Sequence, residues 1–144
     1  MAIFFFNPNG PCGDLSNFSN HGVEMEGLFW PTVEHYYQAQ KFDYPEHQEI
    51  FRSACTPHQA KRLSRTTSLP MKSNWDQIKD EIMFEAILMK FKTHKGPRDL
   101  LLSTGNTVLI EKSPGDYYWG CGYDGTGKNK LGLLLTKVRT ILAS

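Results

Sequence analysis

Apolar and polar residues alternate along this chain of 144 residues with two periods, one typical of β-strands and the other of α-helices. Three segments are short and apolar, or alternate with the period of a strand, and turn-forming residues or a proline follow the first two. We expect strands over Ala2–Phe6, Val23–Trp30 and Thr107–Glu111. A glycine-rich loop is expected after the last of them, over Ser113–Gly127.

Helices are expected where apolar residues recur every three or four positions. Thr32 has the position of an N-cap, and Pro45 and Pro57 suit the first turn of a helix, where no N–H is needed. The longest predicted helix covers Asn74 to about Lys92, with Trp75, Ile78, Ile82, Ala86 and Met89 at helical spacing. The others are Val33 to about Phe42, two short helices that begin at Pro45 and Pro57, Pro97–Leu102 and Asn129–Leu142.

Helices outnumber strands in this pattern, and the two do not alternate regularly along the chain. A parallel sheet covered by helices on both faces needs that alternation, so a doubly wound fold is excluded. No repeat, linker or low-complexity tract divides the sequence. We therefore expect an α+β fold, mainly helical with a few short strands, in a single domain over residues 1–144.

The overall charge is close to zero, because 16 Lys and Arg against 15 Asp and Glu leave a net charge of +1. This argues against tight, non-specific binding to long nucleic acid. The longest apolar runs, such as Ile3–Phe6 and Leu131–Leu135, are far too short to span a membrane. The three cysteines (Cys12, Cys55 and Cys121) are widely scattered and no export leader begins the chain, so we expect a reducing, cytoplasmic location.

The positive charges are nevertheless gathered in two stretches that contain no acidic residue. One lies between Glu49 and Asp76, and the other follows Asp124. Such stretches suit a phosphorylated ribose or a modified end of a nucleic acid. The first holds Arg52, Lys61, Arg62, Arg65 and Lys72, and the second holds Lys128, Lys130, Lys137 and Arg139.

The glycine-rich loop matches two phosphate-binding patterns in part. Gly120 to Gly125 fit G-x-G-x-x-G, and Gly122 to Asn129 lack only the final Ser or Thr of a magnesium phosphate loop. Only about 15 residues follow, too few for a dinucleotide-binding βαβ unit. Two interpretations remain: backbone N–H groups at the start of the next helix bind an anion beside Lys128 and Lys130, or the loop is a tight surface turn.

A stripe of polar residues follows one face of the predicted helix after Thr32. Glu34, Gln38 and Lys41 stand at i, i+4 and i+7, which places a carboxylate, an amide and an amine in line. Taken alone, such a stripe is usually a solvated face. The functional interpretation is that Glu34 and Lys41 point into a cleft, where a carboxylate transfers protons and a desolvated lysine attacks a sugar aldehyde carbon.

The sequence lacks the residue patterns that a metal site or a cysteine nucleophile requires. The five histidines form no H-x-x-x-H pattern and there is no C-x-x-C pair, so no metal is expected, and His35 has no second ligand at metal spacing. A nucleophilic Cys121 has no nearby residue that resembles an activating base.

Four segments together resemble one family, the NADAR family of YbiA-like N-glycosidases. The likeness extends from Phe4 to Arg139, in the family's order and at similar spacing. The segments are Leu15–Phe18, Thr32–Phe42 (TVEHYYQAQKF), Leu109–Gly120 (LIEKSPGDYYWG) and Gly125–Gly132 (GTGKNKLG) with Val138-Arg139.

The resemblance implies a compact, mainly helical α+β fold and hydrolysis of an N-glycosidic bond between ribose C1 and a base nitrogen. Two substrate groups are associated with the family: phosphorylated ribosylamino-pyrimidines from riboflavin synthesis, and ADP-ribose attached to guanine, including guanine in nucleic acid. Neither a metal nor another cofactor is implied, and no membrane or obligate protein partner is expected.

The same resemblance assigns site residues. Glu34 matches the family's catalytic glutamate and Lys41 its motif lysine, which forms a Schiff base with the opened ribose in members that remove ADP-ribose. Trp75 and Asp116 match the other active-site positions. Lys72 stands close to Trp75 where an arginine is expected, and it supplies a point charge in place of a fork. The residues matching the substrate-facing loops are Ser16, Asn17, Phe18, Trp119, Gly120, Gly122, Asp124, Gly125 and Asn129.

Cleavage of a ribosyl C–N bond calls for a general acid near the base and a negative charge or nucleophile near C1. Glu34 is the preferred acid and base, Lys41 the residue that traps C1 as an imine, and Trp75 a stacking partner for the departing base. Trp75 and Trp119 could equally be core residues. The alternative to an enzyme is a non-catalytic module that binds ADP-ribose or a related nucleotide. A purely structural protein is disfavoured, because the polar stripe has no evident packing reason.

Overall fold

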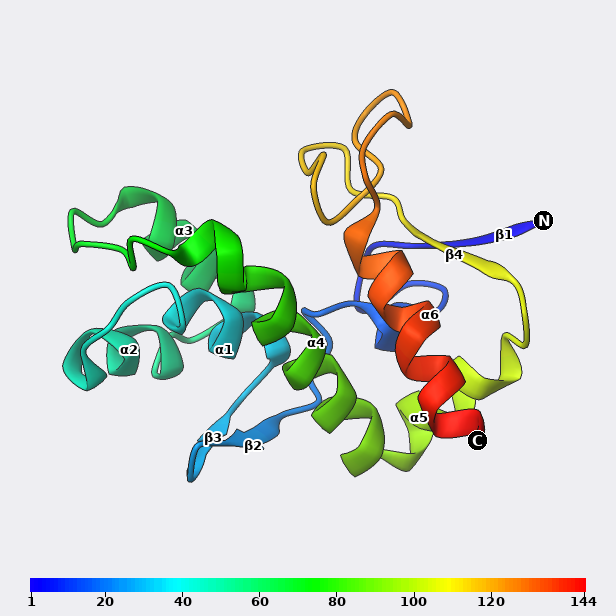
Figure 1. Ribbon diagram of the computed structural model, residues 1–144, viewed down its shortest axis with the longest axis horizontal. Coiled ribbons are helices and arrows are strands. Elements are labelled where there is room, and N and C mark those ends of the chain that lie inside the picture. The colour runs from blue at the N-terminus through cyan, green and yellow to red at the C-terminus, as the bar shows by residue number, and fades with distance from the viewer. The chain divides into compact units, whose positions relative to one another are not determined.

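A computed structural model describes residues 1–144 and contains six α-helices, one short 3-10 helix (η1) and four strands (Figure 1). The strands are β1 (Ala2–Phe5), β2 (Val23–Met25), β3 (Leu28–Trp30) and β4 (Val108–Glu111). The helices are η1 (Gly13–Leu15), α1 (Val33–Ala39), α2 (Pro45–Arg52), α3 (Pro57–Thr66), α4 (Trp75–Thr93), α5 (Lys95–Ser103) and α6 (Lys130–Ala143). The mainly helical α+β composition is confirmed.

The chain divides into two compact units. One comprises Asn20–Lys90, and the other comprises Met1–Ser19 together with Phe91–Ser144. The helix α4 belongs to the first unit as far as Lys90. None of the helices combines the length and the hydropathy that a membrane-spanning segment requires.

The unit Asn20–Lys90 begins with a β-hairpin, where a single strand over Val23–Trp30 was expected. The strands β2 and β3 pair antiparallel, with Met25 opposite Leu28. The two residues between them, Glu26 and Gly27, have φ angles of 54° and 79°. Positive φ at both positions of a two-residue hairpin loop is typical of a type I′ turn. The single strand was therefore wrong, because Glu-Gly formed a turn that the alternating pattern alone did not indicate.

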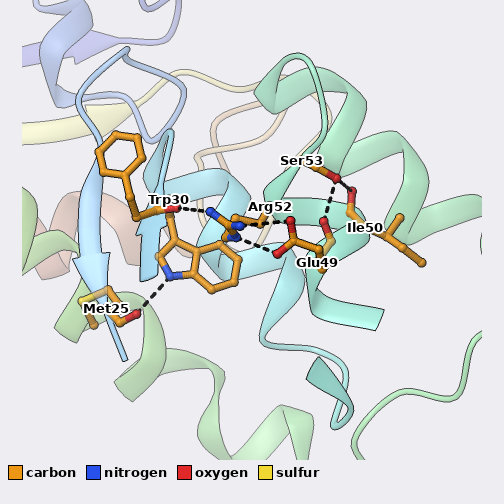
Figure 2. A network of polar contacts seen from close by, with 7 residues as sticks. Met25, Trp30, Glu49, Ile50, Arg52 and Ser53 are labelled. Carbon is orange, nitrogen blue, oxygen red and sulfur yellow. Dashed lines mark hydrogen bonds and ion pairs between the residues drawn. The ribbon is translucent and has the colours of Figure 1, made fainter. Parts of the chain in front are cut away.

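Strand β3 of the hairpin is joined to α2 by a polar network (Figure 2). Arg52 on α2 donates a hydrogen bond to the Phe29 carbonyl at 3.1 Å and forms an ion pair with Glu49 at 2.7 Å. Within the hairpin, the Trp30 indole N–H donates to the Met25 carbonyl at 3.2 Å. Arg52 is thus one residue of the first basic stretch whose charge is already paired within the protein.

Helix α1 packs against α2, α3 and β3 and is buried along its whole length. The Thr32 side chain caps it by accepting a hydrogen bond from the His35 N–H, and Thr56 caps α3 in the same way. Pro45 and Pro57 lie in the first turns of α2 and α3, as expected. Because α1 has no solvent-facing side, its polar side chains need partners inside the protein.

In the other unit, β1 and β4 form a two-stranded parallel sheet, with Ala2 opposite Val108 and Phe5 opposite Glu111. Helix α6 packs on β4 and on α5. Arg139 on α6 is 8% exposed and donates hydrogen bonds to the Thr104 hydroxyl and the Thr107 carbonyl at 2.8 and 2.9 Å. This residue of the second basic stretch therefore holds the end of α5 in place.

Candidate active site

The polar stripe of the predicted helix is buried. Glu34 is 6% exposed and Gln38 3% exposed, and the Gln38 side-chain Nε2 donates a hydrogen bond to Glu34 Oε2 at 2.6 Å. The two residues face each other because they stand four positions apart on α1. The interpretation of the stripe as a solvated face is wrong, because α2, α3 and β3 cover the helix that carries it.

Lys41 lies just beyond the helix. α1 ends at Ala39, earlier than the expected Phe42, and Lys41 lies in the turn that follows, where its N–H donates to the Gln38 carbonyl at 3.3 Å. Its ammonium donates to the Ser64 hydroxyl at 3.5 Å and lies 5.6 Å from the centre of the Tyr37 ring. The sequence-predicted lysine is therefore held between α1 and α3.

Burial lowers the pKa of Lys41 below the ordinary lysine value, because it removes water from the charged ammonium. The nearby Glu34 carboxylate opposes this change in pKa, and the positive charges of Arg65, Lys61 and Lys79 reinforce it. These three cations come from α3 and α4. A larger share of neutral amine is what a lysine nucleophile requires.

Trp75 begins α4 and is 6% exposed. Its ring lies 5.2 Å from the ring of Tyr37, at an angle of 55°. Tyr37 thus lies between Lys41 and Trp75, in contact with both. The structure places Lys41 and Trp75 around one aromatic residue of α1, and the Lys41 and Glu34 charges act on each other. Stacking of Trp75 on a substrate base stays a prediction.

His35 has a structural role. Its Nδ1 lies 2.8 Å from the Thr32 hydroxyl, and its Nε2 lies 3.0 Å from the Ala54 carbonyl. A carbonyl only accepts, so Nε2 carries the proton, and Nδ1 accepts from Thr32. Burial lowers the pKa of this histidine, which favours the neutral ring. His35 therefore joins the start of α1 to the segment between α2 and α3.

Asp116 and Trp119 lie together in the unit that contains the glycine-rich loop. The Asp116 Oδ1 accepts hydrogen bonds from the N–H groups of Tyr118 and Trp119 at 3.0 and 2.8 Å. Trp119 is 8% exposed, and its ring is edge-on to Tyr118. One carboxylate oxygen of Asp116 thus shapes the turn, and the catalytic role of Asp116 stays a prediction.

The N–H groups at the start of α6 are occupied within the protein. Those of Lys128, Asn129, Lys130 and Leu131 each donate to a carbonyl of the segment Tyr117–Gly120, at 2.9 to 3.0 Å. An anion cradle at this helix start needs unpaired N–H groups, so the pairing of these four favours the interpretation as a tight turn. The ammonium groups of Lys128 and Lys130 lie 5.6 and 5.7 Å from the centre of the Tyr118 ring.

The other predicted loop residues differ in what they contact. Asp124 is at the exposed tip, where its carboxylate accepts from the hydroxyl and N–H of Thr126; these bonds lower its pKa. Gly122 has a φ of 75°, and a Cβ there would lie 2.3 Å from the Tyr117 ring, whereas one at Gly125 would meet open space. A Cβ at Gly120 would press on the Glu111 carbonyl at 3.0 Å. Substrate binding by these residues stays a prediction.

Near the N-terminus, Ser16 and Asn17 are buried, and the Ser16 hydroxyl accepts from the Phe18 N–H at 3.1 Å. This bond forms a local turn directly after η1. The segment Ser16–Phe18 therefore has a defined conformation, and its contact with a sugar stays a prediction.

Asn129 joins the glycine-rich loop to the sheet. Its Oδ1 accepts from the Glu111 N–H at 3.0 Å, and its Nδ2 donates to the Leu109 carbonyl at 2.9 Å. Both polar atoms of the side chain are thus engaged with the backbone of β4, and the residue has the left-handed φ of 52°. This gives Asn129 a structural role beside the substrate contact predicted for it.

Asn129→Gly is expected to lower the free energy of unfolding by about 2 kcal/mol, because two part-buried backbone groups lose their partner. Glycine accepts the left-handed φ, so the loss reports on the amide and not on strain. Asn106→Gly, at an exposed asparagine, has the same effect on the unfolded chain and serves as the control. Urea denaturation followed by circular dichroism measures both; equal losses would contradict the structural role.

The family model of the NADAR domain matches residues 4–143 of this sequence, and so covers both units. The chain belongs to the NADAR family. Its relatives include the "N-glycosidase Npun_R5314" of Nostoc punctiforme, which is 44% identical over 142 residues, or 96% of this chain and 91% of the relative. The "N-glycosidase YbiA" of Escherichia coli is 41% identical over 98% of this chain and 88% of its own length.

The NMR structure of Escherichia coli YbiA has the same fold, with a TM-score of 0.90 and 41% sequence identity over 99% of this chain and 84% of that one. A longer relative is the chloroplast riboflavin biosynthesis protein PYRR of Zea mays, 41% identical over 96% of this chain, which spans only 25% of the plant protein. The expected YbiA-like fold and NADAR membership are confirmed.

Three residues of this NADAR domain contact predicted site residues, and the sequence alone assigned no role to them. Gln38 donates a hydrogen bond to Glu34, the Ser64 hydroxyl accepts one from Lys41, and the Tyr37 ring lies beside the Lys41 ammonium. Gln38 and Tyr37 lie in a recognised motif, but only the burial of α1 shows that they have no solvent to face. Ser64 is remote from Lys41 in sequence, and no local signal connects the two.

Proposed function

We propose that this N-glycosidase of the NADAR family hydrolyses the C1–N bond of a phosphorylated ribosylamino-pyrimidine or of ADP-ribosylated guanine. The observation that carries the proposal is the half-buried lysine near a buried glutamate. Burial and three neighbouring cations lower the pKa of Lys41, and Glu34 lies close enough for its charge to act on that amine. A carboxyl group and a partly neutral amine are the two groups that imine-forming C–N hydrolysis needs.

In the reaction we propose, the C1–O bond of the ribose ring breaks, the ring oxygen takes the proton of the base N–H, and a C1=N bond to the base is left. The neutral Lys41 amine adds to C1, and the base nitrogen then leaves with the electrons of the C1–N bond. Glu34 passes the two protons of the lysine nitrogen, one after the other, to the leaving nitrogen, so no net proton is consumed. Water then adds to the imine carbon and the C1 aldehyde is released, which restores Lys41. The overall balance is substrate plus water to free base plus ribose derivative.

Trp75 and Asp116 are assigned to this reaction by the resemblance to the family. Trp75, in ring contact with Tyr37, stacks on the departing base. Asp116 is the second carboxylate, which stabilises positive charge at C1 and the ring oxygen. Cations near Lys41 hold the phosphate of the substrate. Lys61 and Arg65 on α3 are two of them, because each lies near enough to Lys41 for its charge to lower the pKa of that lysine. Ser16, Asn17, Phe18, Trp119 and the loop residues bind the rest of the substrate.

Parallel assays of the two substrate classes test the function. Chromatographic separation after incubation is expected to show free pyrimidine or free guanine, with the matching ribose product. Saturable binding of both ligands without release of a base would contradict hydrolysis. Release from one class alone identifies the base and the group at the 5′ position.

The rate of imine formation is expected to fall when a neighbouring cation is removed. The ordinary pKa of lysine is 10.5, and Arg65 helps to hold that of Lys41 below it. Arg65→Gln removes a positive charge that opposes protonation of Lys41, so the pKa of Lys41 rises and less neutral amine remains near pH 7. The pH profile of borohydride trapping therefore moves to higher pH, with a rate near pH 7 lower by about twofold or more.

Arg62→Gln is the matched control for this measurement. Arg62 is exposed on the same helix and is not among the charges that act on Lys41. Its profile is expected to coincide with that of the wild type. A profile for Arg65→Gln that does not move, or that moves to lower pH, would contradict the assigned cause of the lowered pKa.

A further inference from the structure

Gln38 is a buried amide with only one of its two polar atoms paired. Its Nε2 donates to Glu34 Oε2 at 2.6 Å, while its Oε1 is buried and has no hydrogen-bond partner. The side chain is 3% exposed. A buried acceptor without a donor lowers stability, because the group has lost water and gained nothing in exchange.

An apolar side chain of similar length would fill this position without that cost. Methionine has nearly the same shape as glutamine and leaves no unpaired oxygen. The amide is thus unfavourable for packing around α1, and the bond that it makes goes to Glu34. Such departures from good core packing are expected where a residue serves a site and not the fold.

The bond itself is suited to holding a carboxylate. An amide N–H donated to a charged oxygen is stronger than one between neutral groups, and 2.6 Å is short for such a bond. Both residues lie on one helical face, four positions apart, so the donor is fixed by the backbone of α1. A carboxyl group held in this way keeps its direction while its surroundings change, which a group that transfers protons needs.

We propose that Gln38 is the positioning residue of Glu34: its Nε2 fixes the carboxylate in the orientation from which it exchanges a proton with Lys41 and the leaving base. The inference rests on the proposed function. Gln38 acts through Glu34 and does not itself touch the reacting atoms. Its removal therefore slows the chemical step and leaves substrate affinity and folding largely intact.

Gln38→Met tests this inference against Gln40→Met. Gln40 lies two residues further on and is also buried, but its side-chain Nε2 is unpaired and makes no bond to Glu34. For Gln38→Met we expect kcat to fall at least about tenfold, with KM within about threefold of the wild type. The midpoint of thermal unfolding is expected to change little, because relief of the unpaired Oε1 offsets the loss of the bond to Glu34. For Gln40→Met we expect the kcat and KM of the wild type.

A double-mutant cycle separates positioning from any independent effect. In a Glu34→Gln background, Gln38→Met is expected to change kcat by less than about twofold, because the group it positions is already gone. A full tenfold loss in that background would overturn the inference, as would a kcat within about threefold of the wild type for Gln38→Met alone.

Failure of the proposed function has a different signature. A wild-type protein that releases no base from either substrate class contradicts the function, and the Glu34–Gln38 bond is then judged by NMR. The side-chain amide signals of Gln38 are identified by their loss in Gln38→Met. They should move in Glu34→Gln, where a charged acceptor becomes neutral; unmoved signals would overturn the inference.

Discussion

Glu34→Gln is expected to lower the kcat for release of the base by at least about a hundredfold, the usual scale for loss of a group in general acid–base catalysis. Glutamine has the shape of glutamate but takes up no proton at neutral pH. Its oxygen still accepts from Gln38, so the buried polar pair survives and the fold should be retained. Initial rates of base release, measured by chromatography at matched concentrations of folded protein, give the comparison.

The control for this variant is Glu81→Gln, at an exposed glutamate on α4. This variant makes the same chemical change away from Glu34, Gln38 and Lys41, so its kcat should equal that of the wild type. Near-wild-type kcat in Glu34→Gln would remove Glu34 from the mechanism. Equal losses in both variants would point to a general effect of charge.

Lys41→Ala is expected to abolish covalent trapping of the substrate by borohydride. Reduction of an imine joins the nitrogen of the lysine to C1 of the ribose permanently, and only a primary amine forms that bond. Burial and neighbouring cations lower the pKa of Lys41, which favours its reaction near neutral pH. Mass spectrometry of the intact protein and of its peptides measures the adduct and locates it.

An exposed lysine supplies the comparison for trapping. Lys92→Ala, near the end of α4, should give the same adduct mass and yield as the wild type. An undiminished adduct in Lys41→Ala would remove the imine from the mechanism. Loss of the adduct together with unchanged kcat would mean that trapping captures a side reaction.

The positions of the secondary-structure elements were largely predictable from the sequence because their signals are local. Thr32 and Thr56 are followed by helices that they cap, and Pro45 and Pro57 lie in first helical turns. The β-hairpin was missed for an equally local reason, since Glu26-Gly27 is not among the turn pairs that mark such a loop most strongly. The parallel pairing of β1 with β4 joins residues too far apart in sequence for any local pattern to indicate.

The residues proposed for the candidate site could be named from the sequence, but their burial and their neighbours in space could not. The i, i+4 spacing of Glu34 and Gln38 follows from the period of a helix, and the motif around them indicated the NADAR family. Whether such a stripe faces water depends on what packs over it, and here α2, α3 and β3 cover α1. The usual interpretation of a polar stripe therefore failed at this helix.

The glycine-rich loop shows the same difference between local features, which the sequence indicates, and contacts in space, which it does not. Its glycines and the helix that follows were read correctly from the sequence, and so was the possibility of a tight turn. The alternative, an anion at the start of α6, depends on unpaired N–H groups, and the carbonyls of Tyr117–Gly120 pair four of them. Hydrogen-bond partners within a folded loop are decided by its three-dimensional course, which a pattern of residue types does not contain.

By itself, the sequence determined the α+β class, most element boundaries, the family and the residues that carry the proposed chemistry, because caps, periodicity and motifs depend on neighbours along the chain. The tertiary structure decided their physical state. It buried Glu34 and Gln38 together, placed Lys41 against Ser64 and beside three cations, and engaged Asn129 with β4. Desolvation and charge act through space, so a lysine's proton affinity is decided by the helices that fold around it.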